Sequence, residues 1–273
     1  MKIADFTSKK SSLAQGYRTC SGCPITTIVR HVLRATDDPV VVAVATGCLE
    51  VTTTIFPDTA WEVPLVHSLL ENAAATISGI ESAYKTLRRK NKLPDDQPIK
   101  FVVFAGDGAT YDAGLQFLSA AIERGHDFVY VCYNNEGYMN TGGQKSGATP
   151  EGAITTTTPA GRKHHRKDLT KIIAAHDIPY AAQAAVWHWQ DLYSKAQKAF
   201  AMQGPAFLNV FSPCVPGWKI DTDKAIELSR LAVETGYWEL YEVEKGEKKI
   251  TVPVEKPKPI EEFKKLQGRF KNK

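Results

Sequence analysis

Short runs of consecutive apolar residues, separated by helix-like segments, most limit how this chain can fold. The runs lie at 39–45 (PVVVAVA), 100–105 (KFVVFA), 127–133 (DFVYVCY), 178–182, 206–211 (AFLNVF) and 237–243. Such runs suit strands that are buried on both faces, as in a parallel sheet. Helix-like segments lie at 24–35, 69–89, 111–124, 168–175, 190–202 and 225–234. This alternation predicts an α/β fold with a doubly wound, mostly parallel sheet.

The length of the chain and its lack of clear linkers suggest how it divides into domains. Its 273 residues, 43% of them hydrophobic, can bury one large core or two small ones. There is no internal repeat, and the prolines at 94–98 break only a helix. We predict an N-terminal arm (1–15), one ligand-binding domain (16–243) and a charged C-terminal tail (244–273). The lysines of the tail indicate either an acidic partner or a solvated segment.

The composition and the N-terminal residues bear on where the protein acts. The net charge is only +4, and 23% of the residues are charged, which is ordinary for a soluble globular protein. Residues 1–12 are polar and lack the apolar stretch of a signal peptide. No run approaches the roughly 18 apolar residues that a membrane span requires. We expect a cytoplasmic protein with no membrane or nucleic-acid partner.

A glycine–aspartate–glycine turn, Gly106-Asp107-Gly108, follows the predicted strand 100–105 and precedes a helix. Glycines let the backbone approach a ligand, and a helix N-terminus favours a diphosphate there. Asp107 supplies a hard oxygen of the kind that Mg²⁺ binds. Alone, such a turn is more often structural. However, Asn135 follows the next strand, 28 positions later, so adjacent strand ends bring it beside Asp107.

The chain has five cysteines, Cys20, Cys23, Cys48, Cys132 and Cys214. An odd number with one C-x-x-C pair is a poor disulfide framework, and metal or cluster ligation is the better interpretation in a cytosolic protein. Cys48 and Cys214 both follow strand-like runs, at the sheet edge that the ligand is expected to occupy. Four thiolates at that edge could hold a [4Fe–4S] cluster, although a zinc site stays open. Cys132 lies inside an apolar strand and is interpreted as a buried core residue.

Several motifs occur together. They are GYRTCSGC (16–23), ATGCLEVTTT (45–54), LLENAAATISGIESAYK (69–85), GDGATYDAGLQ (106–116) and YNNEGYMNTGGQKSGATP (133–150). In combination, over roughly residues 16–218, they resemble the β subunit of pyruvate:ferredoxin oxidoreductase and its relatives. The resemblance implies a thiamine-diphosphate-binding fold. One departure is Pro24-Ile25 after the second cysteine, where many relatives carry glycine and then a polar residue, so a cofactor contact could differ.

The family resemblance implies a reaction and its cofactors. A 2-oxoacid, most readily pyruvate, is decarboxylated on thiamine diphosphate, the acyl group passes to coenzyme A, and electrons pass through a [4Fe–4S] cluster to ferredoxin. A thiamine enzyme needs an activating glutamate, which in this family lies on another subunit or domain. No ferredoxin-like C-x-x-C-x-x-C-x-x-x-C-P run is present, so further clusters must also lie elsewhere. The resemblance therefore predicts an obligate hetero-oligomer.

The resemblance also assigns roles by position. Asp107, Asn135 and the Gly137 carbonyl would bind Mg²⁺, and Asn140 would reach the reacting centre as the catalytic residue. The cluster ligands would be Cys20, Cys23, Cys48 and Cys214. The cofactor-binding residues would be Gly47, Cys48, Gly106, Asp107, Gly108, Ala109, Asn135, Gly137, Tyr138, Met139, Asn140 and Thr141.

The sequence leaves alternatives open for the substrate and for the type of protein. The substrate could be a branched-chain 2-oxoacid or oxalate. The chain could instead be a non-redox thiamine-dependent decarboxylase or synthase subunit, or a zinc-stabilised interaction module. The loop 134–166 is long enough to suggest a function. The basic run 162–167 at its end could contact coenzyme A or a partner subunit, but a solvated loop is the simpler interpretation.

Overall fold

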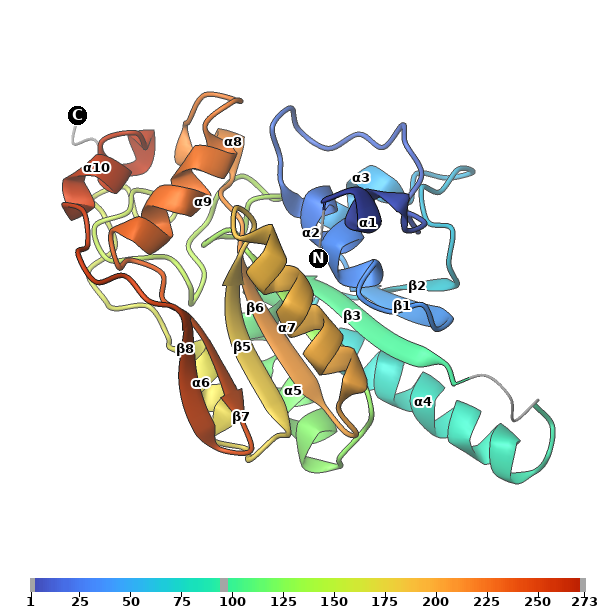
Figure 1. Ribbon diagram of the computed structural model, residues 1–273. Helices are drawn as coiled ribbons and strands as arrows, with labels where there is room; N and C mark the ends of the chain where they lie inside the picture. The colour runs from blue at the N-terminus through green and yellow to red at the C-terminus, as the bar shows by residue number, and fades with distance from the viewer. Residues whose placement is uncertain (1–2, 94–97, 271–273) are drawn as a thin grey trace.

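A single sheet of eight strands runs through the computed structural model, which describes residues 3–93 and 98–270 (Figure 1). The strand order is β2-β1-β3-β4-β6-β5-β7-β8. The strands are β1 (Val40–Ala45), β2 (Leu65–Ser68), β3 (Lys100–Gly106), β4 (Val129–Asn134), β5 (Tyr180–Ala185), β6 (Ala206–Phe211), β7 (Leu240–Glu244) and β8 (Glu247–Val252). The neighbouring strands β2, β1, β3, β4, β6 and β5 are all parallel to one another. β7 pairs antiparallel with β5, and β7 and β8 form an antiparallel hairpin at this edge. The mostly parallel α/β fold is confirmed.

Helices cover both faces of this sheet. They are α1 (Ile3–Ser8), α2 (Ile25–Leu33), α3 (Cys48–Thr53), α4 (Ala73–Arg89), α5 (Leu115–Glu123), α6 (Leu169–Ala174), α7 (Trp189–Ala201), α8 (Val215–Trp218), α9 (Ala225–Glu234) and α10 (Ile260–Lys264). A π-helical turn, Gly108–Ala113, precedes α5, and a 3₁₀ turn, Gly268–Phe270, follows α10. The helix predicted over 111–124 thus begins earlier, in a wider turn. Within the described residues, no helix is long and apolar enough to cross a membrane.

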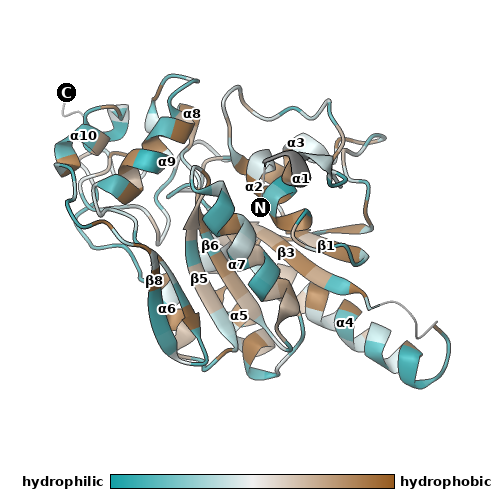
Figure 2. Cartoon of the chain, in the orientation of Figure 1, coloured by the Kyte–Doolittle hydropathy of each residue, from teal (hydrophilic) through white to brown (hydrophobic). Residues whose placement is uncertain are grey.

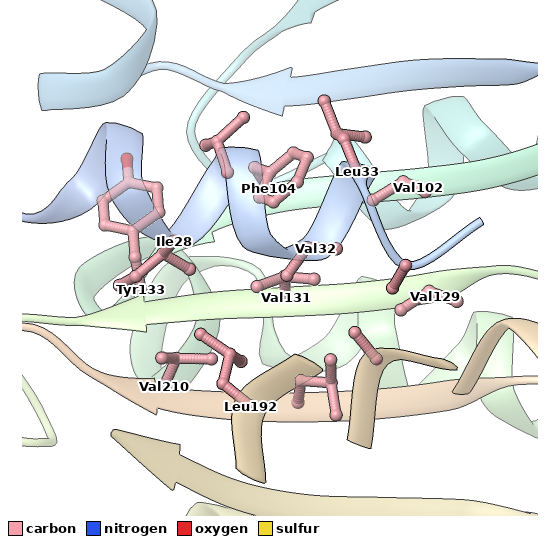
Figure 3. Packing of buried hydrophobic residues seen from close by; sticks show 14 of the residues in the cluster. Ile28, Val32, Leu33, Val102, Phe104, Val129, Val131, Tyr133, Leu192 and Val210 are labelled. Carbon is pink, nitrogen blue, oxygen red and sulfur yellow. The ribbon is translucent and has the colours of Figure 1, made fainter. Parts of the chain in front are cut away.

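The buried side chains of β3 show why the fold has two helical layers. Val102 and Phe104 pack on one face with α2 and α7, as Figure 3 shows for the α2 side. Phe101, Val103 and Ala105 pack on the other face with α4, α5 and α6. Because neighbouring side chains in a strand point to opposite faces, an uninterrupted apolar run satisfies both layers.

Sequence patterns missed two edge strands. β2 is only four residues long, and the two middle residues of its sequence, LVHS, are exposed. β8, with the sequence EKKITV, is exposed over most of its length and largely hydrophilic in Figure 2. Neither strand needs an apolar run, because an edge strand of a sheet is covered on fewer sides than a central one. The proline break predicted at 94–98 falls largely outside the described residues.

The segment after 243, expected to be a charged tail, is folded onto the domain. β8 extends the sheet, and Phe263, Gln267 and Arg269 are buried. The apolar anchors of this segment are sparse among its charges, so the sequence shows no clear hydrophobic pattern. The predicted N-terminal arm is also attached, since Leu13 is buried and bridges to Trp61. The division into an arm (1–15), one domain (16–243) and a tail (244–273) stays a prediction.

Gly79 gives a direct test of local stability in α4. It is exposed in the middle of the helix, and an added Cβ would meet no atom within 4 Å. Gly79→Ala should therefore raise the free energy of unfolding by about 0.5–1 kcal/mol, because alanine loses less backbone entropy in a helix. Urea denaturation of the full chain measures this. The matched control is Gly114→Ala, whose Cβ would lie 2.6 Å from the carbonyl oxygens of Ala109 and Glu71 and should destabilise. A higher free energy of unfolding in both variants, or in neither, would contradict this prediction.

Candidate active site: two adjoining cavities at one sheet edge

The carboxyl ends of β1, β3 and β4 surround a cavity of about 120 Å³, here called the strand-end cavity. Parallel strands place the residues that follow them at one edge, where α/β folds bind ligands. Every predicted cofactor-binding residue except Asp107 lines the cavity. The lining residues are Thr46, Gly47, Cys48, Leu70, Gly106, Gly108, Ala109, Tyr133, Asn135, Gly137, Tyr138, Met139, Asn140 and Thr141. The structure thus brings the predicted set together, while the role of these residues in binding stays a prediction.

Asp107 lies behind this lining and is fully buried. Its Oδ1 accepts a hydrogen bond from the Asn135 backbone N–H (3.1 Å), and its Oδ2 accepts one from the Ser146 hydroxyl. Burial raises the pKa of Asp107 to about 7, although these two hydrogen bonds act in the opposite direction. A buried carboxylate of this kind is stabilised in its charged form by a nearby cation.

Asn135 and Gly137 complete an oxygen-rich corner beside Asp107. As placed, the side-chain oxygen of Asn135 lies 2.9 Å from both Gly137 O and Asp107 Oδ1. Turning the amide would let its nitrogen donate to both oxygens. The Asp107 carboxylate, the Asn135 amide and the Gly137 carbonyl thus bring oxygen atoms together at this corner. The donor set therefore fits Mg²⁺, which binds protein and phosphate oxygens.

Two glycines of the cavity lining leave room for aromatic side chains. A Cβ on Gly108 would lie 2.4 Å from the Tyr138 ring, whose hydroxyl donates to Gly108 O at 3.1 Å. A Cβ on Gly47 would lie 2.9 Å from the Tyr133 hydroxyl oxygen. Any larger residue at either position would displace an aromatic side chain of the cavity wall. The glycines are thus required by the close approach of these two aromatic side chains.

A second cavity of about 190 Å³ adjoins the first and is here called the cysteine cavity. Cys20 and Cys23 come from the loop before α2, Cys48 from the start of α3, and Cys214 from the segment after β6. All four line this cavity, and their role as cluster ligands stays a prediction. Cys132 lies inside β4, fully buried in the core. All five cysteines are free thiols.

Three half-buried thiols of the cysteine cavity are protonated near neutral pH. Burial raises the pKa of Cys23 to about 11 and that of Cys48 and Cys214 to about 12. A metal or cluster binds thiolates, so its binding would release these protons. Within residues 3–93 and 98–270, no three histidine, cysteine or acidic side chains are close enough together to hold a single metal ion.

The two cavities share part of their walls. Cys48, Asn135, Met139 and Asn140 line both. Asn140, the predicted catalytic residue, is exposed at this junction. A group in one cavity therefore lies next to a group in the other.

The residue between Asn135 and Gly137 holds this loop in place, although no sequence pattern assigned it a role. Glu136 is fully buried with a left-handed backbone (φ 61°). Its carboxylate accepts hydrogen bonds from Arg166 (2.9 Å), Arg269 (2.6 Å) and the Tyr237 hydroxyl (2.6 Å). Trp218 adds a bond from its Nε1–H to Asn135 O (2.8 Å). The spacing of these residues along the chain carries no signal of the contact.

The basic run 162–167 is only partly the solvated loop that the sequence suggested. Arg162 donates to Ser146 O and Thr149 O, and Lys167 pairs with Asp112. Arg166 holds Glu136, whereas His165 is exposed and pairs with Glu151. Sequence patterns do not reveal these partners, because they are carbonyls and acids elsewhere in the fold.

Comparison with known proteins places this chain in a family. Residues 45–210 match the model described as "Thiamine pyrophosphate enzyme, C-terminal TPP binding domain". The chain is 50% identical to pyruvate synthase subunit PorB of Thermotoga maritima, over 98% of this chain and 85% of the relative. It is 46% identical to ketoisovalerate oxidoreductase subunit VorB of Pyrococcus furiosus, over 94% and 84%. The chain belongs to the 2-oxoacid oxidoreductase β-subunit family.

A solved structure supports the fold of this family member. The 2-oxoglutarate:ferredoxin oxidoreductase of Magnetococcus marinus aligns with a TM-score of 0.62 at 21% identity, covering 84% of this chain and 80% of that one. The expected family, thiamine-diphosphate-binding fold and enzyme class are confirmed. The matched thiamine domain contains the whole strand-end cavity lining but excludes Cys20, Cys23 and Cys214. The cysteine cavity is therefore a feature added to the thiamine domain by the flanking segments.

Proposed function

We propose that this β subunit works in oxidative decarboxylation of pyruvate with coenzyme A, yielding acetyl-CoA and CO₂ and passing electrons to ferredoxin. Thiamine diphosphate with Mg²⁺ would occupy the strand-end cavity, and a [4Fe–4S] cluster would be held by Cys20, Cys23, Cys48 and Cys214. The observation that carries the proposal is the shared wall of the two cavities. Adjacent sites suit electron transfer from a thiamine-bound substrate to a cluster.

The strand-end cavity offers the groups that a metal–diphosphate pair needs. Asp107, Asn135 and the Gly137 carbonyl would bind Mg²⁺. When bound, thiamine diphosphate supplies the carbanion chemistry, and the protein supplies placement and electrostatics. Asn140, at the junction, would hydrogen-bond the substrate as the catalytic residue.

The cysteine cavity fits a cluster better than zinc. Four sulfurs line one cavity, yet no three ligands within the described ranges are grouped as one ion requires. A cluster spans a larger distance than a single ion, so its cysteine ligands lie farther apart. A non-redox thiamine decarboxylase would have no use for four cysteines beside the cofactor.

The remaining parts of the reaction would come from partner subunits. We expect the activating glutamate and the ferredoxin-like clusters on them, in a cytoplasmic hetero-oligomer. Apart from the 50% match, relatives named for pyruvate are 44–47% identical to this chain, and relatives named for ketoisovalerate are 46–47% identical. Pyruvate is therefore proposed over branched-chain 2-oxoacids and oxalate on the 50% match. Assay of the assembled holoenzyme with each 2-oxoacid tests this choice.

Metal analysis tests the redox proposal most directly. Anaerobically purified protein should contain about four irons and four acid-labile sulfides per chain. Cys214→Ala should lose this iron, while Cys132→Ala, a control in the core strand, should retain it. Electron paramagnetic resonance of the reduced protein should show the cluster. Zinc in place of iron, or iron that survives Cys214→Ala, would overturn the proposal.

A further inference from the structure

Ser212 is a buried hydroxyl in the wall of the cysteine cavity. It follows β6 directly, is fully buried, and lies two positions before Cys214. Among the described residues, its Oγ has no hydrogen-bond partner. Buried hydroxyls are nearly always paired, and an unpaired one costs free energy, so such a group needs a reason.

The backbone fixes where this hydroxyl lies. The Ser212 N–H donates to Asn134 O at 2.8 Å, continuing the pairing of β6 with β4. Pro213, which also lines the cavity, restricts the backbone between Ser212 and Cys214. The sheet thus fixes the backbone of Ser212 in the wall of the cavity that the four cysteines also line.

Another hydroxyl of the same cavity is already satisfied. Thr52, in α3, donates from Oγ1 to Cys48 O at 2.7 Å and also approaches Leu49 O. The hydroxyl proton of Thr52 is therefore already donated to a backbone carbonyl of α3. Ser212, in contrast, has a proton with no acceptor among the described residues.

We propose that Ser212 donates a hydrogen bond to a sulfur of the group bound by the four cysteines and thereby raises its reduction potential. This rests on the proposed function, because it requires a cluster in the cysteine cavity. Reduction adds one electron to a cluster, and the charge falls largely on its sulfurs. A donor to sulfur stabilises that added charge, so it favours the reduced state. Ser212 is thus a positioning and tuning residue, which does not itself touch substrate.

The test compares three variants in the anaerobic holoenzyme: Ser212→Ala, Ser212→Thr and Thr52→Val. Iron and sulfide are measured first, so that loss of the cluster is separated from a change in its properties. The potential is then determined by redox titration followed by electron paramagnetic resonance. Ser212→Ala should shift the potential to a more negative value. Ser212→Thr keeps the hydroxyl and should restore it, and Thr52→Val should leave it unchanged.

Each outcome has one meaning. An unchanged potential in Ser212→Ala, or equal shifts in Ser212→Ala and Thr52→Val, would overturn the tuning role. If alanine loses iron, Ser212→Gly provides a second hydroxyl-free variant for the same titration. In addition, double-resonance spectra of the wild type should show an exchangeable proton coupled to the cluster that the hydroxyl-free variant lacks. Wild-type protein without iron would reject the proposed function itself, a result distinct from a failure of Ser212.

Discussion

Asp107→Asn is expected to lower the affinity of the chain for Mg²⁺ and thiamine diphosphate by roughly 100-fold or more. Loss of groups that merely orient metal ligands already costs about 10–100-fold, and Asp107 would be a direct ligand. The substitution preserves shape but removes the negative charge from a fully buried position. Titration of the purified full chain with thiamine diphosphate and Mg²⁺, followed by calorimetry, measures the effect.

The control for this variant is a buried carboxylate away from the cavity. Glu242→Gln removes a charge from β7, where Glu242 pairs with Lys198 (2.6 Å) and accepts from the Tyr180 hydroxyl (2.8 Å). Its strand partner is Ala182, in the first half of β5, and it lines neither cavity. It should leave the affinity within about threefold of wild type, a difference of less than about 1 kcal/mol. If both variants lost the same affinity for thiamine diphosphate and Mg²⁺, the effect of Asp107→Asn would come from a general loss of stability and not from a lost metal ligand.

Arg269→Met is expected to destabilise the chain by about 3 kcal/mol, at the lower end of the 3–5 kcal/mol that follows loss of one partner from a buried ion pair. The Arg269 guanidinium lies 2.6 Å from Glu136, and both side chains are almost completely buried. It also stacks on the Trp218 ring, with 3.6 Å between the guanidinium carbon and the ring centroid. Arg166 and Tyr237 remain as partners of Glu136, so the loss should not reach the upper end.

Chemical denaturation of the full chain measures this loss, and an exposed ion pair provides the control. Lys248 pairs with Glu239, and both side chains are about half exposed. Lys248→Met should therefore cost about 0–1 kcal/mol. Arg269→Met should also weaken thiamine diphosphate binding, because Glu136 lies between Asn135 and Gly137. If both variants lost a similar free energy of unfolding and cofactor binding stayed intact, the C-terminal segment would not hold the loop that contains Glu136.

The amino-acid sequence determined the core of the fold and much of the candidate site. The apolar runs at 39–45, 100–105 and 127–133 are local signals, because burial on both faces leaves no polar position in a strand. Their ends also locate Asp107 and Asn135 at one edge, since parallel strands end on the same side of a sheet. The four cysteines could be grouped for the same reason, as Cys48 and Cys214 follow strands.

Only the tertiary structure decided how distant segments complete this edge. The Glu136–Arg269 pair joins residues 133 positions apart, and Ser212 is recognisable only by its missing partner. β8 and α10 bind through a few apolar contacts among many charges, so no periodic pattern marks them. The physical reason is that periodicity reports the environment of one segment at a time. Which buried charge meets which partner depends on how whole layers pack. The sequence around one residue of such a pair therefore does not indicate the other residue.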